Sequence, residues 1–411
     1  MTSDTRAVDS SQARVVVVSA FCVGLGASLG FVPGFVATTL MDDLSLSRSE
    51  VGLLVSVHFG CTGVGSMLGG RLTEVLGARI VIVADMAIVC GSALFAAAVG
   101  TYWALMVAAV CAGFAYSLAN AGTNVAIGRS IPVQQRTMAL SLKTAGVPLM
   151  AVVAGGVGPI TASKFGWPPV LVVAGGLAAV VAVVAAFTFD DDRPTRKASR
   201  ADGALLIGFG WFPVGAFLLV AGSQPLYSWT VAYLEQALDT PPGLAGGVAA
   251  GASAGGVVVM VLSARFADRK GPDARMRRLR QLICATIGGT ILVLIGEFVG
   301  FGLVALGCFV GIGAQLAAIG TMHAAVVDRV PHAVAYATGV TMTGYYLGAL
   351  VAPVVFGVFV DVFDRYTWSW GLSGLVLVAS LPAWSAAARS HSSPSAGAIP
   401  MPAPLTRKGE S

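Results

Sequence analysis

The stretch "GGRLTEVLGARIVIV", residues 69–83, joins two long hydrophobic runs. It places Gly70, Arg71, Glu74, Gly77 and Arg79 within ten positions of one another. The runs on either side carry almost no charge, so the charged residues gather on a turn only a few residues long. What such a turn does depends on the kind of chain that carries it.

The composition is that of a membrane protein. The 411 residues are 56% hydrophobic and 11% charged, with a mean hydropathy of +0.82, whereas about 25% of residues are charged in a soluble domain. Runs such as 15–40, 80–99 and 170–187 reach the length of about 20 residues that a helix needs to cross a bilayer. Helices satisfy their own backbone in lipid, and these runs are too long for barrel strands. An all-α, multi-pass membrane protein is therefore predicted.

Hydropathy predicts twelve spans in two sets of six. They lie near 15–40, 51–72, 80–99, 103–127, 137–162, 170–188, 204–234, 244–266, 279–298, 302–326, 334–360 and 369–388. The predicted domains are a polar tail (1–14), a first six-helix bundle (15–188), a central loop (189–203), a second bundle (204–388) and a disordered tail (389–411).

The basic residues predict the orientation. Of the 25 Lys and Arg residues, 21 fall on one side of this topology and three on the other, and Lys143 falls inside a span. Because loops rich in Lys and Arg stay in the cytoplasm, both termini and the central loop are expected to be cytoplasmic. The expected location is the cytoplasmic membrane.

The two halves show an internal repeat. Residues 70–80 align with 264–274 at an offset of 194, which pairs Glu74 with Asp268. Residues 142–154 align with 340–352 at an offset of 198, which pairs Gly146 with Gly344. Two matches at nearly one offset indicate a duplicated six-helix unit, and hence two pseudo-symmetric bundles.

Twelve spans, a central loop and the turn after the second span resemble the major facilitator superfamily of secondary transporters. The departures from its turn motif are Glu74 for the usual Asp, Val75 for the following Arg, and Ala264 for the first Gly of the second copy. The resemblance implies that the turn latches the cytoplasmic side between the two halves; simple anchoring by basic residues is the alternative. The implied gate residues are Gly70, Glu74, Gly77, Arg79, Asp268, Arg269 and Gly271.

The resemblance also implies one central cavity, which the first and fourth helices of both halves surround. Polar residues inside spans are costly unless they face water or a ligand, although helix–helix hydrogen bonding is an alternative. The fourth span carries Tyr116, Asn120 and Asn124 on one helical stripe. Pro225 is expected to kink the seventh span, where Trp229 and Tyr233 are interpreted as interfacial aromatics.

Lys143 is a basic residue inside the fifth span. It lies seven residues past Arg136, roughly 10 Å along a helix and about a third of the way through a core of about 30 Å. It either snorkels back to the surface or awaits an anionic substrate, and "SLKTAGVPL" is similar to a segment of bacterial permeases for cyanate and small anions. The candidate substrate-binding set is Lys143, Asn120, Asn124, Tyr116, Gln224, Tyr227, Gln315, His323 and Tyr345.

Carboxylates are scarce inside the spans. Asp85 and Glu297 lie on the third and ninth spans, which are peripheral in the fold that the chain resembles, and Asp85 is expected to be a helix-packing or latch partner. The spans expected to line the cavity carry acids only at their ends. Exporters that exchange cationic drugs for protons commonly need such an acid, so its absence favours an anionic substrate.

The predicted function is secondary active transport by alternating access, with proton-coupled uptake of a small organic anion. Efflux of drugs or metabolites by proton antiport stays open, since Gly158-Pro159 partly matches an antiporter motif, and a non-transporting sensor is the third alternative. His323 and His58 are candidate proton carriers. The expected partners are a small-molecule substrate, protons and the lipid bilayer. No enzyme activity, cofactor, metal site or nucleic-acid partner is expected, and the chain is expected to be a monomer.

Overall fold

Fourteen α-helices are present in the computed structural model, which describes residues 10–190, 209–268, 272–329 and 334–389. The N-terminal half contains α1 (Ser10–Phe35), α2 (Ala37–Leu44), α3 (Arg48–Leu76), α4 (Ala78–Val99), α5 (Tyr102–Ser130), α6 (Val133–Phe165) and α7 (Pro168–Thr188). The C-terminal half contains α8 (Trp211–Ser228), α9 (Thr230–Leu238), α10 (Pro242–Asp268), α11 (Pro272–Val299), α12 (Phe301–Arg329), α13 (Val334–Phe363) and α14 (Tyr366–Ala388).

These fourteen helices correspond to twelve spans. Val36 alone separates α1 from α2, and Trp229 alone separates α8 from α9, so the first and seventh spans are each broken once. Ten of the described helices are long and apolar enough to cross a membrane, and α3, which is bent, is an eleventh if it counts as one span. The broken pair α8–α9 supplies the remaining span. Its break lies four residues after Pro225, close to the predicted kink.

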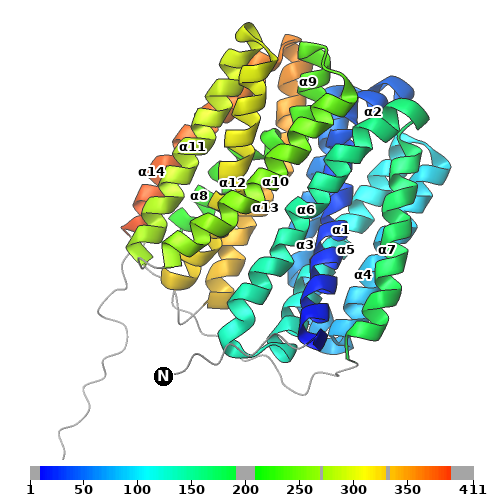
Figure 1. The fold of residues 1–411 in the computed structure, drawn as a ribbon, viewed down its shortest axis with the longest axis vertical. Helices are drawn as coiled ribbons and strands as arrows, with labels where there is room; N and C mark the ends of the chain where they lie inside the picture. Colours follow the sequence, from blue (N-terminus) through cyan, green and yellow to red (C-terminus); the bar gives the residue numbers. More distant parts are fainter. Residues whose placement is uncertain (1–9, 191–208, 269–271, 330–333, 390–411) are drawn as a thin grey trace, which may run out of the picture.

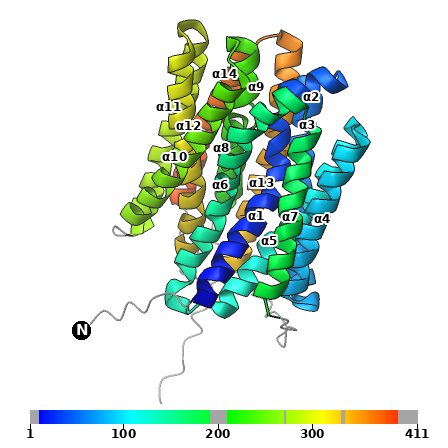
Figure 2. The same ribbon diagram turned by 45° about the vertical axis from the view of Figure 1, so that its right-hand side comes forward.

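The helices form two bundles side by side (Figure 1, Figure 2). Within each half the packing is equivalent, since α1 packs along α6 and α8 packs along α13. Across the boundary between the halves, α3 packs along α13 and α6 along α10. We call the end that carries α2 and α9 the closed end. The opposite end, where α1 begins and the α3–α4 turn carries Arg71 and Arg79, is called the basic end.

Local details of the two halves repeat at the offsets found in the sequence. Ser45, which directly follows α2, has a left-handed φ of 53°, and Asp239, which directly follows α9, has a φ of 47°. A Cβ atom on Gly146 would lie 2.0 Å from the carbonyl oxygen of Ala20, and one on Gly344 would lie 2.0 Å from that of Pro213. The aligned glycines therefore allow the same close helix approach in both halves.

We expect Gly146→Ala to destabilise the protein because the added methyl group would force α6 away from α1. Overpacking of this kind costs about 1–3 kcal/mol, which should lower the melting temperature of the purified protein in detergent. Gly176→Ala is the matched control, since nothing lies within 4 Å of its Cβ position. Equal melting temperatures for the two variants would contradict this account of the packing.

Local sequence explains how α3 is delimited. A capping box begins the helix, in which the backbone N–H of Ser47 donates to Glu50 Oε2 (2.8 Å) and that of Glu50 donates to Ser47 Oγ (3.3 Å). Gly77 stands between α3 and α4 with a φ of 89°, a conformation that favours glycine. The charged turn at residues 69–83 therefore lies at the basic end.

Candidate functional site

Lys143 lies inside the bundle and binds two side chains of α5. Its Nζ donates to Asn124 Oδ1 at 2.8 Å and to Asn120 Oδ1 at 3.5 Å. The Asn120 amide nitrogen donates in turn to the carbonyl oxygen of Tyr116 at 3.2 Å. Lys143 is only 4% exposed, so it does not reach the surface by snorkelling. The structure thus brings together Lys143 and the polar stripe of the fourth span.

The positive charge of Lys143 is not neutralised by these partners. Amide oxygens accept hydrogen bonds but carry no formal charge, and an ammonium group has three N–H donors for the two acceptors present. Among the described residues, no carboxylate lies within ion-pair distance of Lys143. Asn124 is exposed, so the group that holds Lys143 lies beside accessible space. An anion arriving there would find an uncompensated cation.

His323 approaches the same place from the C-terminal half. Lys143 and His323 are close enough to interact electrostatically, although they belong to α6 and α12 on opposite sides of the boundary. His323 Nδ1 lies 2.9 Å from the carbonyl oxygen of Ile319, and Nε2 lies 3.1 Å from Met342 Sδ. A ring that donates to its own helix in this way is well fixed in orientation, so His323 is a rigid part of the site.

Aromatic and amide side chains complete the candidate set. Tyr345 interacts with Tyr116 from the other half and with Tyr227, and the Tyr227 ring lies 5.3 Å from that of Phe31 on α1. Gln224 Nε2 and Gln315 Oε1 are buried without a hydrogen-bond partner in the described part of the chain. Unpaired polar atoms of this kind are rare in folded proteins and mark places where a ligand or water can bind.

Two aromatic residues lie in the interior and not at the membrane interface that the sequence predicts. Trp229 and Tyr233 are 1% and 0% exposed. Trp229 Nε1 donates to the carbonyl oxygen of Pro353 at 3.1 Å, and Tyr233 packs on the ring of Trp370. The interfacial interpretation was wrong because the break between α8 and α9 places both rings in the interior.

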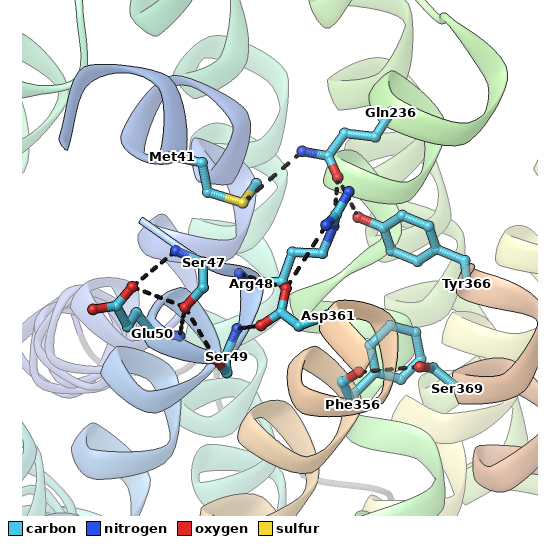
Figure 3. Close-up of polar contacts among 10 residues, drawn as sticks. All are labelled: Met41, Ser47, Arg48, Ser49, Glu50, Gln236, Phe356, Asp361, Tyr366 and Ser369. Carbon is cyan, nitrogen blue, oxygen red and sulfur yellow. Dashed lines mark hydrogen bonds and ion pairs between the residues drawn. The ribbon is translucent and has the colours of Figure 1, made fainter. Parts of the chain in front are cut away.

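A polar network joins the two halves at the closed end (Figure 3). Asp361, near the end of α13, accepts hydrogen bonds from the backbone N–H groups of Arg48 (3.1 Å) and Ser49 (2.8 Å) in the first turn of α3. Arg48 Nη1 lies 3.7 Å from the same carboxylate. A carboxylate of one half therefore caps a helix of the other, where its charge also interacts favourably with the helix dipole.

Further contacts extend this network to the helices after the two breaks. Gln236 on α9 accepts hydrogen bonds at Oε1 from Arg48 Nε (3.0 Å) and from the Tyr366 hydroxyl (2.8 Å). Thr38 on α2 donates a hydrogen bond to the Glu235 carboxylate on α9. A Cβ atom on Gly52 would lie 2.4 Å from the carbonyl oxygen of Pro353. The halves are thus in tight contact at this end.

Comparison with known proteins decides the family. The sequence model of the Major Facilitator Superfamily matches residues 16–299 and 230–408. The chain belongs to this superfamily. Its members are multi-pass membrane transporters, so the protein is a secondary transporter rather than an enzyme.

Solved structures of three transporters have a similar fold. A bacterial homologue of the human lysosomal transporter Spinster, in an inward-facing and occupied conformation, superposes with a TM-score of 0.76 at 16% identity, over 94% of this chain and 98% of that one. A D-xylose–proton symporter gives 0.76 at 14% identity, over 93% and 100% of the two chains. The nucleoside transporter NupG gives 0.71 at 16% identity, over 92% and 98%. The predicted fold of two six-helix bundles is confirmed.

The first copy of the superfamily's turn motif makes no latch contact with the described residues in this conformation. A Cβ atom on Gly70 would meet nothing within 4 Å, and the exposed Glu74 makes no hydrogen bond or ion pair with any residue that the structure describes. Arg79 is partly exposed and Asp268 ends α10. Arg269 and Gly271 lie outside the described residues. The halves are joined at the closed end while Glu74 at the basic end is unengaged.

This geometry sharpens the expectation for Glu74. Because Glu74 makes no contact here, Glu74→Gln should leave this conformation stable and weaken only the opposite one, in which the superfamily's latch would form. Transport in proteoliposomes should slow while substrate affinity changes little, since one state gains population without new ligand contacts. Glu74→Asp, which restores the superfamily's usual acid, is the control and should keep the wild-type rate. A wild-type rate for Glu74→Gln would leave the turn a role in anchoring only.

Proposed function

We propose that this transporter takes up a small organic anion together with protons, and that Lys143 selects the charge of the substrate. One observation carries the proposal: Lys143 is buried and hydrogen-bonded, yet it is held by amides rather than by a carboxylate. A cation kept inside the membrane without a counter-charge is costly. A substrate carboxylate would remove that cost on binding.

The other candidate residues suit an anion with further polar groups. A carboxylate could accept a charge-assisted hydrogen bond from the third N–H of Lys143, and Gln224 and Gln315 offer unpaired amide groups for the rest of the ligand. Tyr116, Tyr227 and Tyr345 would cover its apolar parts. One copy of the chain supplies both sides of this site, which supports a monomer.

Alternating access would follow from the two bundles, residues 15–188 and 204–388, rocking about the site. If the basic end faces the cytoplasm, as the Lys and Arg distribution predicts, this conformation is closed to the outside. Opening toward the outside would require the network around Asp361 and Arg48 to separate and the turn at Glu74 to engage.

Efflux by proton antiport is the second candidate, and one feature of the closed end favours it. A cavity of about 670 Å³ there is lined by the acidic residues Asp42, Asp43, Glu235 and Asp239, with Lys164 as the basic residue among its lining. Its negative field would attract cations and hasten the departure of an anion. An acidic outer cavity suits release better than capture of an anion.

A transport assay in proteoliposomes would distinguish proton-coupled uptake from efflux by proton antiport. Vesicles with an alkaline interior are offered a panel of radiolabelled small carboxylates, with their uncharged amides and cationic dyes as comparison compounds. The proposal predicts accumulation of a carboxylate, abolished when a protonophore collapses the pH gradient. Extrusion of a preloaded dye, neutral compound or carboxylate by the same inward proton gradient would favour efflux.

A further inference from the structure

Among the described residues, Asp85 is a fully buried acid whose two carboxylate oxygens both lack a partner. It lies on α4 with an exposed fraction of 0%, and neither of its carboxylate oxygens has a hydrogen-bond partner among the described residues. Glu297 and Asp328 also have one buried oxygen without a partner, but their second oxygens bind Thr367 and Arg275. The burial of Asp85 is compatible with the expected role in helix packing, but the carboxylate makes no polar contact with a described residue through which it would act as a latch in this conformation.

This environment tolerates a neutral acid far better than a carboxylate ion. An ionised carboxylate without hydrogen bonds in an apolar interior is heavily penalised, and such groups are found protonated or paired. Ile82, Met86 and Val89, on the same helix, are all fully buried. A residue with a purely structural role here would be served equally well by an uncharged side chain, because Asp85 makes no polar contact.

The groups around Asp85 offer it no positive charge. Cys22 on α1 and Tyr116 on α5 interact with it electrostatically. The helix α7, which packs along α4, has no ionisable side chain. From α3, His58 stacks on the Tyr116 ring at 6.0 Å, and neither of its ring nitrogens has a described partner. A proton on Asp85 is thus the simplest way to remove its charge in this conformation.

Tyr116 connects Asp85 to the candidate substrate site. Its phenol group is close enough to Asp85 to interact electrostatically, and its carbonyl oxygen accepts a hydrogen bond from Asn120, which holds Lys143. Tyr116 also interacts with Tyr345 and Tyr346 of the C-terminal half. A charge that appears on Asp85 would act on the part of α5 where the two halves and the Lys143 group meet.

We infer that Asp85 is the site of the coupled proton, neutral when the closed end is shut and ionised when that end is open. The carboxyl group takes a proton from water on one side of the membrane and returns it to water on the other side. Tyr116 transmits the change to the Lys143 site. This inference rests on the proton coupling in the proposed function. It assigns the coupled proton to α4, which contributes no residue to the candidate substrate site, and not to His323.

The test follows the conformation of the full-length protein without a substrate. Spin labels on cysteines at positions 99 and 299, exposed ends of α4 and α11 at the closed end, report the separation of the halves. Cys284, a native cysteine that is exposed, is replaced by serine. In otherwise wild-type protein, we expect the distance distribution measured by pulsed electron resonance to shift from short to long distances as the pH is raised.

Asp85→Asn should keep the short distance at every pH, because its side chain is neutral throughout. Asp85→Glu should restore a transition with a displaced midpoint, which shows that the loss does not come from misfolding. Asp364→Asn, at an exposed acid of the same end where asparagine tolerates the φ of 50°, should behave like the wild type.

Three results would overturn the inference, and they have different meanings. A wild-type transition in Asp85→Asn would remove Asp85 from the coupling while proton coupling itself stands. A transition lost in His58→Gln but kept in Asp85→Asn would assign the proton to His58. A wild-type protein without any transition would contradict proton coupling, and the assignment of Asp85 with it.

Discussion

Lys143→Gln is expected to lower the affinity for an anionic substrate by roughly ten- to a hundredfold, since a hydrogen bond to a charged group contributes about 1.5–3 kcal/mol. The affinity for the uncharged amide of the same compound should change little. Glutamine can still bridge to Asn120 and Asn124, which hold the lysine at 3.5 and 2.8 Å. The substitution therefore removes the charge while keeping much of the local packing.

Calorimetry with a carboxylate and its amide would measure this difference in wild type and variant. Lys143→Arg is the matched control: it keeps the charge, but its planar guanidinium does not fit a site built for a compact ammonium group. We expect it to retain the preference for the carboxylate at reduced affinity. Equal losses for both ligands in Lys143→Gln would mean that Lys143 only supports the fold, and the anion proposal would fail.

Asp361→Ala is expected to open the closed end. It removes two hydrogen bonds to the first turn of α3 and the ion pair with Arg48. Loss of a helix cap costs about 0.5–2 kcal/mol, and a shift of one or two kcal/mol changes a two-state ratio by roughly five- to thirtyfold. The open population, measured by the spin-label pair at positions 99 and 299, should rise by about that factor.

Asp361→Asn separates the cap from the charge, since its amide oxygen can still accept a backbone hydrogen bond while the ion pair is lost. Its open population should lie between those of wild type and Asp361→Ala. Asp364→Asn, near the same end but absent from the network, should leave the distribution unchanged. An unchanged distribution in Asp361→Ala would show that packing of α3 on α13 closes this end without the polar network.

Much of the fold could be predicted because its signals are local and repeated. Runs of apolar residues mark the spans, and the repeat at offset 194 has structural counterparts such as the left-handed residues Ser45 and Asp239. The stripe of Tyr116, Asn120 and Asn124 follows from helical periodicity. Its contact with Lys143 could not be derived from the sequence, because it depends on how α6 packs beside α5.

The network at the closed end could not be predicted at all. Arg48 and Asp361 are 313 residues apart, lie in different halves and have no sequence pattern that pairs them. For Trp229 and Tyr233 the difficulty is different, because the sequence signal exists but fits two positions. An aromatic residue with a polar tip near the end of a span fits an interfacial position and a buried one equally well, and only the packing of α9 decides between them. The lack of a polar partner for Asp85 among the described residues could not be predicted either, because the sequence indicates that this residue lies in a span but not what surrounds its carboxylate.

A structure of the protein bound to its transported carboxylate would test the central claim most directly. The account predicts a carboxylate oxygen within about 3 Å of Lys143 Nζ, with Gln224 or Gln315 paired to the rest of the ligand. A ligand bound elsewhere, with Lys143 still held only by Asn120 and Asn124, would contradict it.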